Sequence, residues 1–214
     1  MKSGSGKSVT GGLCESLQSN LLAAIFETLP VNKRLLVLDM GAAIGSIVNF
    51  FNKFKCRLSF ADLCAGDFVV YPCGEATHSE RVSQFQHHLN LPAGTKIDIC
   101  LFWDLFGYLD GPTLMAPIEA LDAHISSDTL RYSIGVRNAD TPLPFFQYGI
   151  ERSTQLSQAN RGGIQPKRYP RSQRDPHHLL SYFEIDKCRL LAGTRVEYLL
   201  IENRHHNTKP QLNF

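Results

Sequence analysis

The apolar residues of this chain follow two patterns, a helical spacing and short unbroken runs. A helical stripe extends from Leu13 to Leu29 and predicts one helix, which Pro30 ends. An unbroken apolar run follows at residues 35–38, and further strands are expected at residues 56–61 and 97–103. Runs without polar alternation are typical of strands covered on both faces, as in a parallel sheet. The pattern therefore predicts a buried sheet with helices around it.

Helical spacing returns between the predicted strands. One helix is expected to follow Gly45, where apolar residues recur at a helical period. Another is expected to open at Thr77, which forms a capping-box sequence with Glu80. A third is expected to begin at Pro112, because proline is well tolerated at the first position of a helix. Strands and helices thus alternate through the middle of the chain.

The last third of the chain departs from this alternation. Residues 129–136 predict a strand, residues 137–174 show little periodicity and predict a long irregular loop, and residues 175–182 predict a short helix. Two strands, Phe183–Leu191 and Arg195–Glu202, follow across a glycine turn. Alternation implies parallel strands, and a terminal strand pair implies an antiparallel one. We therefore predict an α/β fold, a three-layer Rossmann-like sandwich whose mostly parallel sheet has an antiparallel C-terminal hairpin strand.

Length and composition indicate one ordinary globular domain. The 214 residues suffice for one well-filled core, and 43% hydrophobic with 20% charged residues argues against disordered or collagen-like chains. The expected domain covers residues 13–204, between a flexible N-terminus at 1–12 and a C-terminal tail at 205–214. No segment has the pattern of a signal peptide or the length of a membrane span. We therefore expect a cytoplasmic protein without membrane contact.

Charge, cysteines and histidines add little further chemistry. The formal net charge of +2 is too small to indicate nucleic-acid binding by itself. The six cysteines contain no C-x-x-C pair, and three adjacent His pairs lack the spacing of a helical zinc site, so no metal is expected. Residues 4–8, Gly-Ser-Gly-Lys-Ser, lack the leading glycine and the preceding strand of a phosphate-binding loop.

The clearest chemical signal is a glycine turn between a predicted strand and a predicted helix. Its sequence is Asp39-Met-Gly41-Ala-Ala43-Ile-Gly45. Open α/β sheets bind ligands at such strand ends, and glycine lets a ligand approach the backbone. The dinucleotide fingerprint G-x-G-x-x-G fails here, because Ala43 and Ser46 stand where glycines are required. The carboxylate of Asp39 also favours a cationic ligand over a pyrophosphate.

The D-x-G-x-x-x-G pattern resembles motif I of class I S-adenosylmethionine-dependent methyltransferases. Asp62, after the second predicted strand, is similar to the acid that holds the cofactor ribose in this family. Residues 98–109 resemble motif IV, where a strand leads into the active-site mouth, and the closing strand pair matches as well. Ala43 departs from the common motif. No clear third strand ends in an adenine-contacting residue within residues 63–96, which is consistent with a divergent member.

The resemblance implies a binding role for five residues. Gly41, Ala43 and Gly45 would form the floor under the methionine part of S-adenosylmethionine. Asp39 would attract or orient its ammonium group, and Asp62 would hold the ribose hydroxyls. The adenine contacts stay unassigned.

The resemblance also implies two residues at the reacting end. Asp104 and Tyr108 would face the transferring methyl group or the substrate. The sulfonium is already an activated methyl donor, so the protein mainly positions the acceptor and excludes water. Asp104 is the candidate general base where the acceptor must lose a proton. The expected activity is methyl transfer to a substrate that the sequence does not identify, with a small molecule favoured over RNA or protein.

Two alternatives stay open at this point. The incomplete region at residues 63–96 allows a non-catalytic protein of this fold that serves as a binding or interaction module. The arginine-rich segment Arg152–Arg174 allows RNA as a partner, through phosphate contacts and stacking, or a loop that contacts substrate. Oligomeric state is not predicted.

Overall fold

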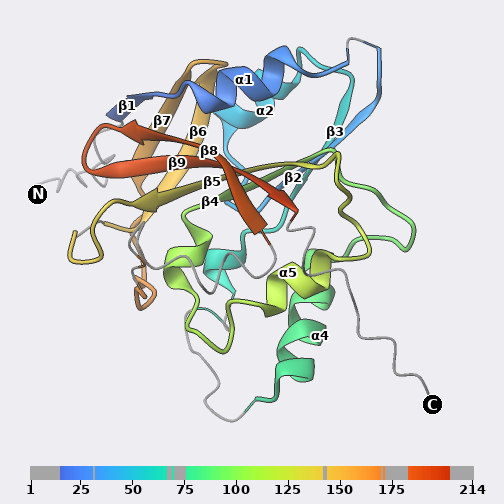
Figure 1. Cartoon of the computed structure of the whole chain (residues 1–214), viewed down its shortest axis with the longest axis vertical. Helices are drawn as coiled ribbons and strands as arrows, with labels where there is room; N and C mark the ends of the chain where they lie inside the picture. The colour runs from blue at the N-terminus through green and yellow to red at the C-terminus, as the bar shows by residue number, and fades with distance from the viewer. Residues whose placement is uncertain are drawn as a thin grey trace, which may run out of the picture.

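The computed structural model describes residues 15–30, 32–66, 69, 76–141, 144–169, 171 and 183–202. Its helices and strands alternate through the middle of the chain, as the hydrophobic pattern predicts (Figure 1). In chain order the elements are β1 (Glu15–Gln18), α1 (Leu21–Glu27), β2 (Leu35–Asp39), α2 (Gly45–Phe51), β3 (Cys56–Phe60), η1 (Leu63–Ala65), α4 (His78–Leu89), β4 (Ile99–Trp103), η2 (Leu105–Tyr108), α5 (Ala116–Leu121), β5 (Leu130–Val136), β6 (Phe146–Arg152), β7 (Gln155–Asn160), β8 (Phe183–Leu191) and β9 (Arg195–Glu202).

Six strands form the main sheet, in the order β3-β2-β4-β5-β9-β8. The first four run parallel to one another, whereas β9 is antiparallel to both β5 and β8. The bounds of β8 and β9 are those predicted from the sequence. The predicted mostly parallel sheet with an antiparallel C-terminal hairpin strand is therefore confirmed.

Helices cover both faces of this sheet, which gives the predicted three layers. Figure 1 shows α1 and α2 on one face and α4 and α5 on the other. One apolar cluster joins Leu38, Phe85 and Phe102 on the α4 side, and a second joins Val37, Phe51 and Leu101 on the α1 side. Strands β2 and β4 contribute to both clusters because successive side chains of a strand point to opposite faces. This double burial explains their unbroken apolar sequences.

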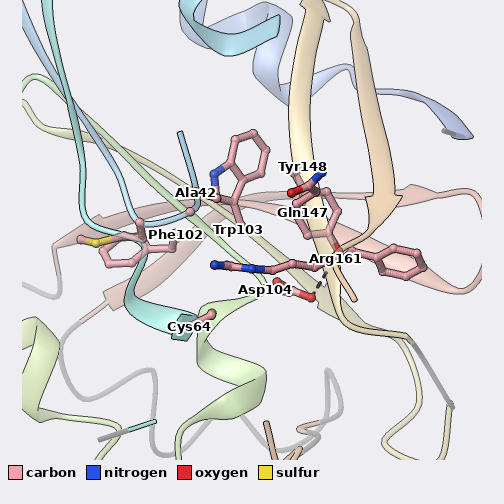
Figure 2. A pocket seen from close by; sticks show the side chains of 11 residues that line it. Ala42, Cys64, Phe102, Trp103, Asp104, Gln147, Tyr148 and Arg161 are labelled. Atoms are coloured by element: carbon pink, nitrogen blue, oxygen red, sulfur yellow. Dashed lines mark hydrogen bonds between the residues drawn. The ribbon is translucent and has the colours of Figure 1, made fainter. Parts of the chain in front are cut away.

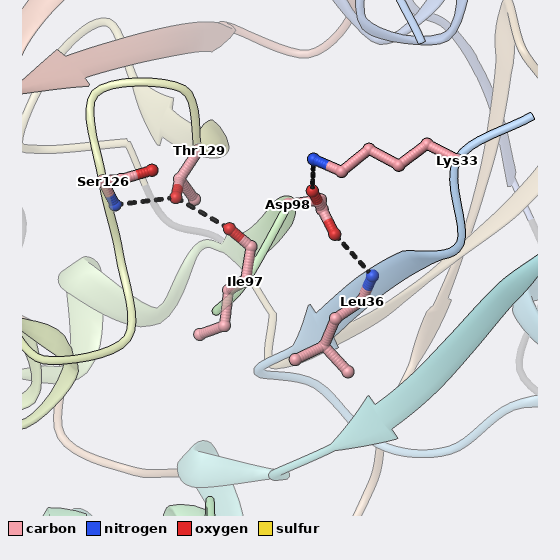
Figure 3. Close-up of polar contacts among 6 residues, drawn as sticks. All are labelled: Lys33, Leu36, Ile97, Asp98, Ser126 and Thr129. Carbon is pink, nitrogen blue, oxygen red and sulfur yellow. Dashed lines mark hydrogen bonds and ion pairs between the residues drawn. The ribbon is translucent and has the colours of Figure 1, made fainter. Parts of the chain in front are cut away.

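A pair of side-chain links fixes the amino-terminal ends of the parallel strands (Figure 3). Asp98 accepts hydrogen bonds from Lys33 Nζ at 2.5 Å and from the backbone N–H of Leu36 at 2.7 Å. The hydroxyl of Thr129 donates to the carbonyl of Ile97 at 2.8 Å. These contacts join the segments that lead into β2, β4 and β5, at the ends of the strands opposite Asp39 and Asp104.

The prediction of one irregular loop over residues 137–174 is wrong. Strands β6 and β7 form an antiparallel hairpin there, and β1 pairs with β7 to complete a three-stranded sheet. Apolar side chains alternate along β6 at Phe146, Tyr148 and Ile150, which is the period of a strand. The hairpin packs on the α1 face of the main sheet, where Tyr148 and Ile150 join the second apolar cluster.

The predicted single helix from Leu13 to Leu29 is also corrected. Among the described residues of this segment, β1 comes first and α1 begins only at Leu21. The break is stabilised by the buried carboxylate of Glu197, which accepts from the Ser19 hydroxyl at 2.6 Å and from the backbone N–H of Asn20 at 3.0 Å. The Glu197 side chain of β9 thus binds the chain at the start of α1. Such a contact between distant residues cannot be predicted from the local sequence pattern.

Other helix predictions have mixed outcomes. The capping box of α4 is confirmed, since Thr77 and Glu80 bond each other's backbone N–H. Helix α5 begins at Ala116 rather than Pro112, because residues 111–115 form turns and Pro117 occupies its first turn. The predicted helix at 175–182 lies outside the described residues. No described residue adds a strand beyond β3.

Among the residues that the structure describes, no helix is long and apolar enough to cross a membrane.

Candidate functional site

Three acidic residues lie at the carboxyl ends of three neighbouring parallel strands. Asp39 is the last residue of β2, Asp62 follows β3 by two residues, and Asp104 comes directly after β4. These strands are adjacent in the sheet, so their ends meet at one edge, where open α/β sheets bind ligands. The structure therefore brings the three predicted acids to one edge of the molecule.

Asp39 is completely buried at this edge. Its Oδ1 accepts hydrogen bonds from the backbone N–H of Gly41 and from Trp103 Nε1, both at 2.7 Å. No described residue donates to its Oδ2. Burial raises the pKa of Asp39 to about 7, although its two hydrogen bonds act in the opposite direction. An uncompensated carboxylate oxygen in this position favours a cationic or hydrogen-bond-donating partner.

The three turn residues have different surroundings. A Cβ on Gly41 would lie 3.0 Å from Trp103 Cδ1 and 3.1 Å from Asp39 Oδ1, so any larger residue would force these side chains to shift. Ala43 and Gly45 are exposed, and a Cβ on Gly45 would meet no atom within 4 Å. Of the three predicted floor residues, only Gly41 lines the cavity described next.

A small cavity lies between these strand ends and the β6–β7 hairpin (Figure 2). Its volume is about 20 Å³. A single water needs about 10–15 Å³ measured in this way, so the cavity has room for about one water molecule. It is lined by Met40, Gly41, Ala42, Cys64, Phe102, Trp103, Asp104, Phe146, Gln147, Tyr148 and Arg161. Three of these lining residues, Phe146, Gln147 and Tyr148, belong to β6. The hairpin therefore covers the strand ends where the sequence predicts a cofactor.

Asp62 is bound by an arginine rather than left free for a ribose. The guanidinium of Arg161, just beyond β7, donates to both carboxylate oxygens of Asp62, each at 2.5 Å. The same guanidinium lies 5.1 Å from the ring centre of Phe145. Figure 2 shows the Arg161 side chain extending into the cavity. The two side chains are 18% and 35% exposed, so water reaches the Asp62 side of this ion pair.

Asp104 and Tyr108, the predicted catalytic pair, lie together in the structure. The Tyr108 hydroxyl donates to Asp104 Oδ2 at 3.2 Å, and the Tyr148 hydroxyl donates to the same oxygen at 3.3 Å. Burial raises the pKa of Asp104 to about 6, while the positive charge of Arg168 and the tyrosine hydrogen bonds lower it. A carboxyl group with a pKa near neutrality is suited to exchange a proton at physiological pH.

The sequence interpretation missed Tyr148 as a member of this site. Its ring stacks on Trp103, with ring centres 5.4 Å apart and an angle of 9° between the planes. The signal that could have found it is the alternation of apolar residues along β6. Arg161 had been noticed only as one cation of an arginine-rich segment.

Several cations of the segment Arg152–Arg174 point inward. The guanidinium of Arg168 lies 5.1 Å from the ring centre of Tyr108. Arg171 donates to the backbone carbonyl of Leu109 at 2.6 Å and to that of Phe106. With Arg161 on Asp62, three of these arginines engage the protein itself. Of these contacts, only the Arg161–Asp62 ion pair offsets a positive charge of the segment. Arg174 lies outside the described residues.

Within the described ranges, no group of three or more His, Cys, Asp or Glu side chains could hold a metal ion.

Comparison with known proteins gives likenesses in structure only. No protein-family model matches the chain. No curated protein matches it. Among solved structures, mitomycin 7-O-methyltransferase is 13% identical with a TM-score of 0.49, and the match covers 86% of this chain and 53% of that one. The chain therefore spans about half the length of that enzyme.

Two further structures are similar to this chain. The 1,6-didemethyltoxoflavin N1-methyltransferase of Burkholderia thailandensis, with bound S-adenosylhomocysteine, is 14% identical with a TM-score of 0.47, over 86% of this chain and 77% of that one. A glycopeptide N-methyltransferase in complex with S-adenosylmethionine is 9% identical with a TM-score of 0.43, over 86% and 95%. The main sheet of this chain, mostly parallel with a closing antiparallel pair, is Rossmann-like.

Proposed function

We propose that this chain binds S-adenosylmethionine at the carboxyl ends of β2, β3 and β4 and transfers its methyl group to a small molecule. The observation that carries the proposal is the convergence of Asp39, Asp62 and Asp104 on one sheet edge, beside a small cavity that Asp104 lines. Asp39 is buried with one carboxylate oxygen lacking a partner, which is costly, so its position at this edge supports a functional role.

The polar groups at this edge suit such a cofactor. The free Oδ2 of Asp39 can accept from an ammonium group or stabilise a nearby sulfonium charge. The two oxygens of Asp62 can accept from the two hydroxyls of a ribose, as they accept from the two nitrogens of Arg161 here. Gly41 leaves room for Trp103 and Asp39 to approach the backbone of the turn, since a Cβ there would crowd both side chains.

The available space does not suit the cofactor in this conformation. Ligand pockets commonly measure about 300 Å³ or more, whereas this cavity measures about 20 Å³. Cofactor binding therefore requires Arg161 to leave Asp62 and the Tyr148 side chain to move away from Trp103. The β6–β7 hairpin carries both groups, so one displacement of the hairpin would release both.

Asp104 is the proposed proton acceptor. When bound, S-adenosylmethionine supplies an already activated methyl group, so the chain needs to orient the acceptor and exclude water. Tyr108 and Tyr148 hold one oxygen of Asp104 in place, and the raised pKa lets this carboxyl group take a proton near neutral pH. Tyr108 is a positioning residue in this scheme.

Isothermal titration calorimetry with S-adenosylhomocysteine tests the proposal, with NADH as the control ligand. We expect micromolar binding of S-adenosylhomocysteine and no binding of NADH. Asp39→Ala and Asp62→Ala should each weaken this binding, while Asp122→Ala, at an exposed aspartate, should leave it unchanged. Unchanged affinity in both site variants would contradict the assigned pocket.

A second candidate function is a non-catalytic binding module of the same fold. The closed cavity and the Arg161–Asp62 ion pair favour it, because both occupy the crevice with the protein's own side chains. Under this alternative neither S-adenosylmethionine nor its demethylated product would bind. The same titration therefore separates the two candidates.

A further inference from the structure

Tyr148 brings a phenol group to both Trp103 and Asp104. Its ring stacks on the indole of Trp103, with the ring centres 5.4 Å apart and an angle of 9° between the planes. Its hydroxyl donates to Oδ2 of Asp104, the proposed proton acceptor, at 3.3 Å. All three residues line the cavity at the strand ends (Figure 2). A phenol of the protein itself thus covers the indole and binds the proposed proton acceptor.

Trp103 presents its indole at this edge through an unusual backbone conformation. Its φ is 50°, in the left-handed region that bulky residues rarely adopt, and the register between β4 and β5 shifts at this point. Its Nε1 donates to Asp39 Oδ1 at 2.7 Å, which fixes the orientation of the ring. Residues held in such costly conformations cluster at active sites and ligand clamps. The indole is therefore a fixed platform for an aromatic ring, since such rings favour offset stacking.

The hydrogen bond between Tyr148 and Asp104 is long. Hydrogen bonds from a hydroxyl to an oxygen commonly measure about 2.7–2.8 Å, whereas this one measures 3.3 Å. A free phenol is not attached to β6, so it can approach the carboxylate to the common distance. The hairpin displacement that the proposed function requires would move the Tyr148 ring off Trp103. Both the indole face and Asp104 Oδ2 would then be open to such a ligand.

We propose that the methyl acceptor is a phenol, which stacks on Trp103 and donates a hydrogen bond to Asp104 in the place that Tyr148 occupies in this structure. This inference rests on the proposed function. In the transfer, the hydroxyl proton passes to Asp104, the bond from the phenol oxygen to the methyl carbon forms, and the bond from the sulfur of S-adenosylmethionine to that carbon breaks. The products are an aryl methyl ether, S-adenosylhomocysteine and protonated Asp104. Tyr148 is then a competitor of the substrate that the chain itself carries.

Three ligands of similar size test this assignment: phenol, anisole and cyclohexanol. Anisole keeps the ring without a donor, and cyclohexanol keeps the donor without a flat ring. Each is titrated into the full chain labelled with ¹⁵N and saturated with S-adenosylhomocysteine, and the indole N–H signal of Trp103, the single tryptophan, is followed. Phenol should shift this signal and saturate at millimolar concentration, with an affinity at least about fivefold above that of either other ligand. Equal binding of phenol and anisole, or no binding of phenol, would overturn the proposal.

Two conservative variants locate the binding place. Asp104→Asn replaces the charged acceptor, so it should weaken phenol binding at least about fivefold and leave anisole binding unchanged. Tyr148→Phe removes the competing hydroxyl, so phenol should bind it about threefold more tightly than the unmodified protein when S-adenosylhomocysteine is left out. Tyr198→Phe, at a tyrosine outside the cavity lining, is the matched control and should bind as the unmodified protein does. Phenol binding that is unchanged in both cavity variants would overturn the assignment.

The titration with S-adenosylhomocysteine that precedes the phenol separates this inference from the proposed function. A shift of the indole signal with S-adenosylhomocysteine and none with phenol would refute the phenol acceptor alone. No shift with S-adenosylhomocysteine would refute the proposed function, and a phenol that still bound would then be no methyl acceptor.

Discussion

Arg161 forms a two-bond ion pair with Asp62 across 99 positions of sequence, and in doing so it occupies the carboxylate assigned to the cofactor ribose. The pair links the end of the β6–β7 hairpin to the loop after β3. It also places a guanidinium in the cavity at the strand ends. Under the proposed function, the cofactor ribose and Arg161 would compete for the same two oxygens.

Replacing Arg161 should raise cofactor affinity. In Arg161→Met, Asp62 keeps its charge and loses its competitor, so we expect S-adenosylhomocysteine to bind about tenfold more tightly, the equivalent of about 1.4 kcal/mol. Calorimetry measures the change. Arg152→Met, at an exposed arginine of the same hairpin, is the control and should show no change. Weaker binding in Arg161→Met would mean that Arg161 itself holds the ligand.

Asp39 and Asp104 should make the protein less stable as pH rises toward 7. Their pKa values in the folded protein, about 7 and about 6, lie above the unfolded value of about 3.9. The folded state then binds more protons than the unfolded state between these limits, so the free energy of unfolding falls as pH increases from about 4 to 7. Thermal unfolding between pH 5 and pH 8 measures the loss.

The variant Asp39→Asn should flatten this pH dependence, because the uncharged amide does not titrate. The part of the loss due to Asp39 is of the order of a few kcal/mol. Asp122→Asn, at an exposed aspartate, should keep the full dependence. A pH profile of Asp39→Asn that matches the unmodified protein would show that Asp39 titrates normally.

Glu197 should be important for stability rather than for binding. It is fully buried and accepts hydrogen bonds from Ser19, Asn20, Leu21 and Tyr132. Removing it in Glu197→Ala leaves these donors unsatisfied, and we expect a loss of about 3 kcal/mol or more in urea denaturation. Glu27→Ala, at an exposed glutamate of α1, should cost less than about 0.5 kcal/mol. A similarly small loss in Glu197→Ala would show that the cap contributes little.

The main sheet could be predicted from the sequence because its signals are local. Unbroken apolar runs identify β2 and β4, which are buried on both faces, and the glycine turn identifies the crevice beside Asp39. The bounds of β8 and β9 follow from two apolar segments across a turn at Gly193.

The covering hairpin could not be predicted because its partners are distant. Strand β7 pairs with β1, more than 130 positions away, and β1 shares an apolar stripe with α1 that looks helical as one segment. The contact between Arg161 and Asp62 depends on the same folding of the hairpin over the sheet. The local sequence pattern therefore predicts the strand ends and the glycine turn. The β6–β7 hairpin and Arg161, which cover them, are placed there by tertiary packing.

Trp103 provides the most direct test that a cofactor enters this site. It is the single tryptophan of the chain, it bonds Asp39 Oδ1, and it stacks on Tyr148. If S-adenosylhomocysteine displaces the hairpin, Tyr148 leaves the indole and the tryptophan emission must change. We therefore predict a saturable fluorescence change with S-adenosylhomocysteine and none with NADH. An emission spectrum that S-adenosylhomocysteine leaves unchanged at saturating concentration would contradict binding at the ends of β2, β3 and β4.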